Sequence, residues 1–241
     1  FRELTADPRL VWQIDPKQRL TAAYYDYRQF DAPRTDKCPP PEAPDNQCLK
    51  YLHQNRTLTY LAWDLLGGEL AAVDQARVSV SYQQQYERTL GFRDNGLPEI
   101  PGGTETHGRD RVQTLGLRTS LSSVRLAIGE QAAIDFDYGA DLWIDWLASD
   151  AWLRFSDVNP PVTSVLPRGQ YLDDSWYLSS GVWLEPTLSI GPRVQIRAGG
   201  RAAAVHAFAK GEDASDSLSV DKTWASAVGN AGLSVRATEW L

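Results

Sequence analysis

The side chains best suited to chemistry form a row of acids in the segment 133–146. Four aspartates lie there, at positions Asp135, Asp137, Asp141 and Asp145. Such a row could supply an acid catalyst or a calcium site. It alternates, however, with apolar residues that occupy the intervening positions, and successive side chains of a strand point to opposite sides. We therefore interpret the four acids as the polar face of a strand.

Other candidate ligands lie in segments predicted to be loops. His107 with nearby Glu105, and the pair Asp173 and Asp174, are possible loop contacts for a ligand, although a solvated loop is the simpler interpretation. The sequence has no paired-cysteine zinc pattern, phosphate-binding loop or nucleophile elbow. It predicts no catalytic residue, no metal site and no cofactor, and the protein is not expected to be an enzyme.

Both cysteines lie in or beside a proline-rich segment. Cys38 and Cys48 are closely spaced there, which suits a disulfide and an oxidising compartment. Two free thiols are the alternative. The sequence contains no Met and begins at Phe1, so we expect a processed chain or a piece of one.

Composition narrows the possible partners. The net charge of −7 argues against nucleic acid. No run of about 18 apolar residues is present to form a membrane-spanning helix. A transmembrane barrel would escape that test, because its apolar residues alternate with polar ones. Nine Trp and ten Tyr are many for this length, and aromatic girdles at the bilayer surfaces explain such an excess.

Period-two alternation predicts about nine strands. They lie near residues 10–14, 19–30, 52–64, 77–85, 109–121, 133–146, 174–185, 193–204 and 225–235. Each has an apolar and a polar face. Besides the four aspartates, the predicted lumen-facing polar side chains are Arg77, Ser79, Ser81, Gln83, Arg193, Arg197 and Arg201.

Shorter and longer connections alternate along the chain. The long ones are predicted near 31–50, 91–108, 149–173 and 209–221. In an up-and-down meander this sorts short turns to one end and long loops to the other, as in outer-membrane barrels. Tryptophans lie near both kinds of connection, at Trp12, Trp63 and Trp183, and at Trp146, Trp176 and Trp224. We predict that 1–241 is part of an antiparallel transmembrane β-barrel in contact with a lipid bilayer, with its long loops outside the cell.

Several segments resemble TonB-dependent outer-membrane receptors, in the order and spacing of that family. They are LTAAYYDY at 20–27, DAPRTD at 31–36, IDFDYGAD at 134–141, RGQYLDDS at 168–175, IRAGGR at 196–201 and VGNAGLSV at 228–235. The resemblance implies a barrel of about 22 strands, closed by a plug and driven by a TonB-type partner in the bacterial outer membrane. Neither plug nor TonB-binding segment is recognised in this sequence. The cysteine pair is not part of the family pattern.

Three functions follow as hypotheses. The first is energised uptake of a scarce nutrient such as a metal chelate or haem, with the rest of the barrel and the plug on this or another polypeptide. The second is a non-energised barrel, either a porin or a structural subunit of an outer-membrane assembly. The third is a soluble β-sandwich that binds a ligand. The sequence does not name a substrate.

Overall fold

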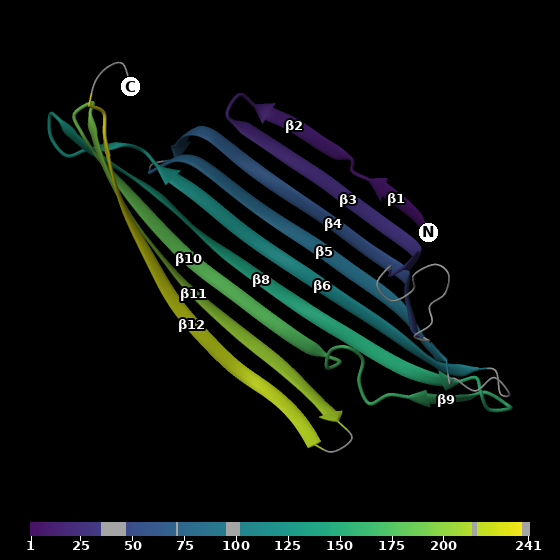
Figure 1. The fold of residues 1–241 in the computed structure, drawn as a ribbon. Helices are drawn as coiled ribbons and strands as arrows, with labels where there is room; N and C mark the ends of the chain where they lie inside the picture. Colours follow the sequence, from purple (N-terminus) through teal and green to yellow (C-terminus); the bar gives the residue numbers. More distant parts are fainter. Residues whose placement is uncertain (35–46, 71, 95–101, 214–215, 238–241) are drawn as a thin grey trace.

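The protein is described by a computed structural model over residues 1–34, 47–70, 72–94, 102–213 and 216–237. These residues form a single antiparallel sheet (Figure 1). Its strands are β1 (Arg2–Ala6), β2 (Arg9–Asp15), β3 (Gln18–Pro33), β4 (Gln47–Leu70), β5 (Val73–Asp94), β6 (Gly103–Ser123), β7 (Leu126–Ala127), β8 (Ala132–Phe155), β9 (Val162–Val165), β10 (Ser175–Ile190), β11 (Val194–Asp213) and β12 (Asp216–Val235). Within these ranges, no helix has the length and apolar character needed to cross a bilayer.

The sheet is an up-and-down meander. Its order is β1-β3-β4-β5-β6-β8-β10-β11-β12, and each of these neighbours is antiparallel. The strand β2 continues along the side of β3 that β1 occupies, whereas β7 and β9 are short additions to β8. The predicted all-β antiparallel fold is confirmed. The sheet does not close: β1 and β2 form one edge and β12 forms the other.

Short turns gather at one end of the sheet. Residues 16–17 join β2 to β3, and residues 191–193 join β10 to β11. In the first turn, the carboxylate of Asp15 accepts hydrogen bonds from the backbone N–H of Lys17, at 2.7 Å, and from the side chain of Gln18, at 2.8 Å. In the second, Gly191 has φ +57°, which glycine adopts without strain. At the opposite end of the sheet β3, β5, β8 and β11 end, and β4, β6, β10 and β12 begin.

Two predicted loops are wrong in extent. In place of a loop over 91–108, β5 continues to Asp94 and β6 begins at Gly103. In place of a loop over 209–221, β11 continues to Asp213 and β12 begins at Asp216. The predicted loop 149–173 contains the end of β8 and all of β9, and the predicted loop 31–50 begins and ends in strand. In the described parts of these segments that belong to strands, the backbone remains paired where the apolar alternation has stopped.

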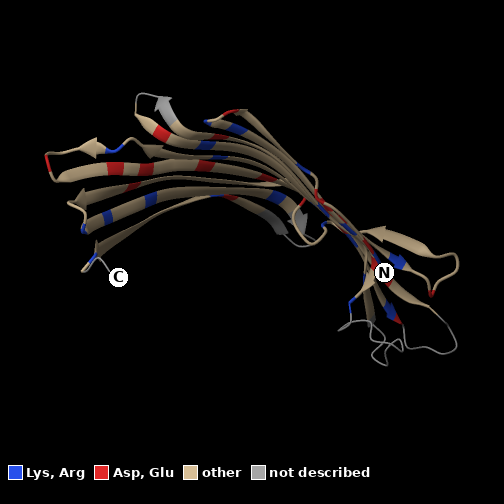
Figure 2. Cartoon of the chain, turned by 90° about the horizontal axis from the view of Figure 1, so that it is seen from above, with Lys and Arg blue, Asp and Glu red and all other residues tan. Residues whose placement is uncertain are grey.

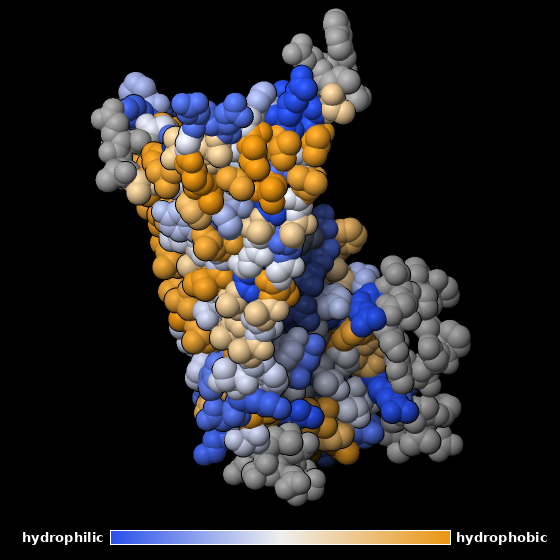
Figure 3. Space-filling view, turned by 90° about the vertical axis from the view of Figure 1, so that its left-hand side faces the viewer, coloured by the Kyte–Doolittle hydropathy of each residue, from blue (hydrophilic) through white to orange (hydrophobic). Residues whose placement is uncertain are grey.

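One face of the sheet, here called the apolar face, is lined by aliphatic and aromatic side chains. A row at mid-height crosses five strands in register, through Ala22, Leu61, Val80, Leu117 and Leu142. In this open sheet Val80 is 48% exposed and Val182 59% exposed, so nothing in the described chain covers them. Figure 3 shows hydrophobic side chains gathered between hydrophilic ends of the molecule.

Aromatic rings bound the apolar face. Tyr24, Tyr82 and Trp146 lie at its limit toward the long connections, and Trp12 and Trp63 lie toward the short turns. Rings with one polar atom favour the boundary between hydrocarbon and water. Two of the six tryptophans assigned to these girdles are on the other face. Trp183 lies opposite Arg201, and Trp224 lies opposite Val205, so both belong to the polar face.

Past the rim formed by Tyr24, Tyr82 and Trp146, the strands continue with polar side chains on both faces. Arg28, Arg109 and Asp150 lie on the extension of the apolar face. In Figure 2 the positions of Lys, Arg, Asp and Glu are spread along the curved sheet. Both faces of this extension are therefore suited to water, as expected for strands longer than a bilayer requires.

The sheet is a single layer, so its buried residues are few and small. Thr21, Ala23 and Ala62 are almost fully buried on the face opposite the apolar one, where larger neighbours cover them. Of the predicted disulfide, Cys38 lies outside the described residues and Cys48 lies in β4 opposite Phe92. The pairing stays a prediction.

The assignment of the two faces can be tested with one charge. Val80→Arg places a guanidinium in the mid-height row of the apolar face and should cost about 2–4 kcal/mol of folding free energy in a bilayer. Ser179→Arg places the same charge on the polar face, in β10, and should cost less than about 1 kcal/mol. Urea titration of the complete barrel in lipid vesicles measures both. Equal costs would show that the faces are misassigned.

Candidate functional site

The face opposite the apolar one, here called the polar face, carries the candidate site. The structure brings onto it Arg77, Ser79, Ser81 and Gln83 from β5, Asp135, Asp137, Asp141 and Asp145 from β8, and Arg197 and Arg201 from β11. The register explains this grouping, because Ser79 lies opposite Arg118 of β6, which lies opposite Asp141. Arg193 is the exception, since it lies in the turn before β11.

Ion pairs link the strands across the polar face. Arg201 binds Asp141 through two contacts, with Nη1 2.8 Å from Oδ1 and Nη2 2.9 Å from Oδ2. This two-pronged geometry fixes both side chains. Arg197 pairs instead with Glu185, at 3.2 Å. Asp137 and Asp145 accept hydrogen bonds from hydroxyl groups of β6, on Ser122 and Thr114.

The most enclosed charge on this face is Asp64. Its side chain is only 7% exposed and lies between two arginines of neighbouring strands. Arg77 Nη1 lies 2.8 Å from Oδ1, and Arg19 Nη2 lies 3.1 Å from Oδ2. Sequence reasoning did not single out Asp64. Its alternation with Trp63 and Leu65 is the signal that assigns it to the polar face.

Glycines let long side chains lie flat on the polar face. A Cβ at Gly116 would collide with the ring of Trp143, and one at Gly139 would collide with Trp183 and with a backbone carbonyl. A Cβ at Gly181 would meet the guanidinium of Arg201, which crosses that position to reach Asp141. The glycines therefore act as notches that fix where two tryptophans and one arginine lie.

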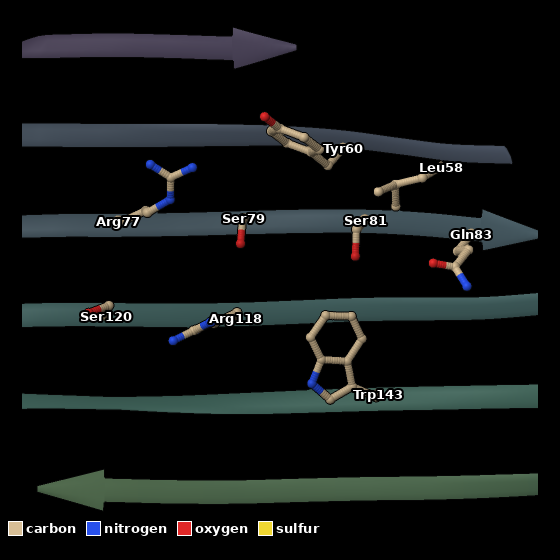
Figure 4. A pocket seen from close by; sticks show the side chains of 9 residues that line it. All are labelled: Leu58, Tyr60, Arg77, Ser79, Ser81, Gln83, Arg118, Ser120 and Trp143. Carbon is tan, nitrogen blue, oxygen red and sulfur yellow. The ribbon is translucent and has the colours of Figure 1, made fainter. Parts of the chain in front are cut away.

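A hollow of about 530 Å³ opens on the polar face over β4, β5, β6 and β8. Its lining is Leu58, Tyr60, Arg77, Ser79, Ser81, Gln83, Arg118, Ser120 and Trp143 (Figure 4). Trp143 reaches from β8 toward β6, and Tyr60 forms the opposite wall.

Charge in this hollow is not balanced. Arg77 is engaged by Asp64, but Arg118 makes no hydrogen bond or ion pair to any described residue, and its row partner Asp141 is held by Arg201. Three serine hydroxyls and the Gln83 amide add donors and acceptors. Two guanidinium groups beside aromatic walls suit a carboxylate or another anion with an apolar body.

Toward the long connections, the polar face holds two neighbouring carboxyl groups. Glu87 lies opposite Asp110. Burial raises the pKa of Glu87, the hydrogen bond from Gln54 at 3.1 Å opposes that change, and the nearby charge of Asp110 adds to it. Glu87 therefore takes up a proton more readily than a fully hydrated glutamate.

The four predicted loop contacts are not brought together. Glu105 and His107 lie in β6 rather than in a loop, on the extension of the apolar face. There His107 Nε2 lies 3.1 Å from Glu105 Oε2, and the imidazole stacks on Trp152. Asp173 accepts a hydrogen bond from the backbone N–H of Ser149, and Asp174 has φ +54° in the turn before β10. Among the described residues, no three possible metal ligands lie close enough to hold an ion.

Similarity to known proteins is structural. No protein-family model matches this sequence, and no curated protein matches it. The copper transporter OprC is 14% identical, with a TM-score of 0.61 over 96% of this chain and 34% of its own. The siderophore receptor PiuA from Acinetobacter baumannii is 12% identical, with a TM-score of 0.64 over 98% of this chain and 40% of its own. The ferric citrate transporter FecA is 14% identical, with a TM-score of 0.62 over 98% and 34%.

All three are TonB-dependent receptors. The chain has the fold of their barrel wall. It spans well under half the length of each of these proteins. In a barrel of this kind the apolar face is turned to lipid and the polar face lines the lumen. The hollow and the cross-strand ion pairs would accordingly lie on the lumen side of the wall.

The enclosed carboxylate gives a stability prediction. Asp64→Asn leaves Arg19 and Arg77 facing each other without a counter-charge, and should lower the free energy of unfolding by about 2 kcal/mol, since both arginines are partly hydrated. Asp150→Asn removes a more exposed partner and should cost less than about 1 kcal/mol. Urea unfolding of the complete barrel compares the two. Equal effects would mean that Asp64 is not an enclosed anchor.

The glycine notches give a second prediction. Gly116→Val should displace Trp143 and cost about 1–3 kcal/mol through overpacking, with loss of the hollow. Gly232→Val is the matched control, because a Cβ at Gly232 meets no atom within 4 Å. The unfolding midpoint and accessibility of the hollow to a quencher report the change. A Gly116→Val protein as stable as the control would contradict the proposed packing.

Proposed function

We propose that this chain is part of the wall of a TonB-dependent receptor in the bacterial outer membrane, and that the receptor takes up a scarce nutrient such as a metal chelate or haem. The observation that carries the proposal is the pairing of two unlike faces on one meander. One face is apolar and bounded by aromatic rings, and the other is polar and cross-linked by ion pairs. The match of this sheet to three receptors, over nearly its whole length, supports it.

The polar face suggests how such a wall would serve uptake. Paired charges, such as Asp141 with Arg201, keep the inner surface hydrated and rigid without a net field. The hollow with Arg118 is the place where an anion would be held. Copper, a siderophore and ferric citrate are the cargoes that the three similar proteins are named for. A carboxylate-bearing metal chelate fits the hollow better than a bare cation, which its two arginines would repel.

The proposed partners follow from the barrel. The open edges β1/β2 and β12 require further strands in a bilayer, on this or another polypeptide. A plug would close the lumen, and a TonB-type protein would supply the energy. The Cys38–Cys48 disulfide is retained as part of the proposal, because an outer-membrane protein passes through an oxidising compartment.

Energised uptake is tested in a strain that lacks the gene. Accumulation of ⁵⁵Fe-citrate, radiolabelled copper and haem is measured with the complete receptor restored, in the presence and absence of the TonB-type energy source. We expect at least one probe to accumulate several-fold above background only when that source is intact. Accumulation that does not depend on it would favour the porin.

A conductance measurement separates the alternatives independently. The purified complete protein in a planar bilayer should be nearly silent, because a plug blocks the lumen. A steady open pore would favour the porin hypothesis. Recovery of the protein in the aqueous fraction without detergent would overturn the barrel itself and favour the soluble sandwich.

A further inference from the structure

Four arginines gather on the extension of the apolar face, just past its aromatic rim. Arg28 lies in β3, Arg88 in β5, and Arg109 and Arg111 in β6. The register makes them neighbours, because Arg88 lies opposite Arg109, and Arg111 lies opposite Tyr86 of β5. Tyr86 in turn lies opposite Asn55, which lies opposite Arg28. We call these four residues the arginine patch.

Among the described residues, two carboxylates bind members of the patch, and a third, that of Asp173, lies near Arg109. Arg28 binds Asp26 at 2.8 Å, and Arg109 binds Asp150 at 2.7 Å. The second contact raises the pKa of the Arg109 guanidinium, so that charge is fixed. Arg88 and Arg111 have no carboxylate partner among the described residues. Arg111 lies over the ring of Tyr86 instead, at 5.7 Å.

The position of Arg88 is unfavourable without an anion. Like charges directly opposite each other on neighbouring strands destabilise a sheet, and Arg88 lies directly opposite Arg109. Its Nε is also buried and has no hydrogen-bond partner in the described protein. A buried donor without an acceptor is destabilising. A phosphate beside these side chains would supply the missing counter-charge.

The side chains change in steps from the apolar face to the patch. Tyr82 and Trp146 form the rim, and Gln113 donates a hydrogen bond to the Tyr82 hydroxyl at 3.0 Å. Farther from the apolar face along β6 lies Arg111, two residues before Gln113 in the sequence. Arg109 lies farther still, two residues before Arg111. This order of hydrocarbon, aromatic ring, amide and guanidinium matches the order of groups across the surface of a membrane.

We propose that the arginine patch binds the phosphate groups of a glycolipid in the outer leaflet of the outer membrane. The proposal rests on the outer-membrane placement under "Proposed function" and adds a lipid partner that uptake does not require. Guanidinium groups bind phosphate oxygens in pairs, and basic clusters at a membrane surface recognise lipid head groups. The patch is on the opposite face of the sheet from the hollow, so it would meet lipid and not the solute in the lumen.

The test compares lipid A with its dephosphorylated form, titrated against the complete receptor in detergent and followed by native mass spectrometry. The wild type should bind phosphorylated lipid A at least tenfold more tightly, and more weakly as salt is raised. The variant Arg88→Gln/Arg111→Gln should lose that preference. The matched control Arg56→Gln/Arg125→Gln removes two arginines from the polar face and the short-turn end, and should keep it.

The outcomes are decisive in each direction. A wild type that ignores the phosphates, or a patch variant that binds as tightly as the control, overturns the proposal. So does full displacement of the lipid by millimolar inorganic phosphate, which would indicate a free anion site. If the double variant does not assemble, as judged by heat-modifiable migration in gels, Arg111→Gln alone replaces it, because that side chain is exposed and contacts only a ring. A several-fold loss is then expected.

The uptake experiments fail independently of this one. If the protein shows no energised uptake but binds lipid A in a phosphate-dependent way, the lipid proposal stands. Only the proposed uptake function is then overturned. Conversely, normal energised uptake with no preference for phosphorylated lipid A would keep the proposed uptake function and overturn only the lipid proposal.

Discussion

Continuous backbone pairing between antiparallel strands is the constraint on which this structure depends. Strands such as β4, β5 and β8 are paired on both sides over most of their length, so nearly every peptide group has its partner within the sheet. In hydrocarbon no water can replace a missing partner, and each unpaired group is costly. Once the ladder is fixed, the side chains have only two directions, and the division into an apolar and a polar face follows from the sequence alone.

The polar face must satisfy charges without a second layer to cover them. It does so by pairing across strands, with Arg201 on Asp141 and with Arg19 and Arg77 on Asp64. These bonds require long side chains to lie along the sheet rather than stand on it. Glycine at the crossed positions makes that possible, as at Gly181. The small residues of the polar face therefore hold the charged ones in place.

Sequence predicted the fold and the faces because both depend on period-two alternation. It placed Asp141 and Arg201 on one face and the long connections at one end. It could not predict strand length, because alternation disappears where both faces meet water, and β5 and β6 continue there as polar strands. Glu105 and His107 were assigned to a loop for that reason. Trp183 was assigned to the wrong face because the sequence does not distinguish a tryptophan that lies over a glycine from a tryptophan in an aromatic girdle.

The open edges define what this wall needs in order to act. Among the described strands, none pairs with the outer side of β12, and β1 and β2 leave the far side of the sheet equally open. The unpaired backbone groups of either edge would be costly in hydrocarbon. The strands that complete the ladder are therefore as necessary to the site as the arginines within it. The apolar face also needs a completed barrel. Side chains such as Val182 are covered only when lipid surrounds a closed wall. The proposed transport would thus be a property of the completed barrel, to which this sheet would contribute a polar lining, the hollow beside Arg118 and an apolar outer surface.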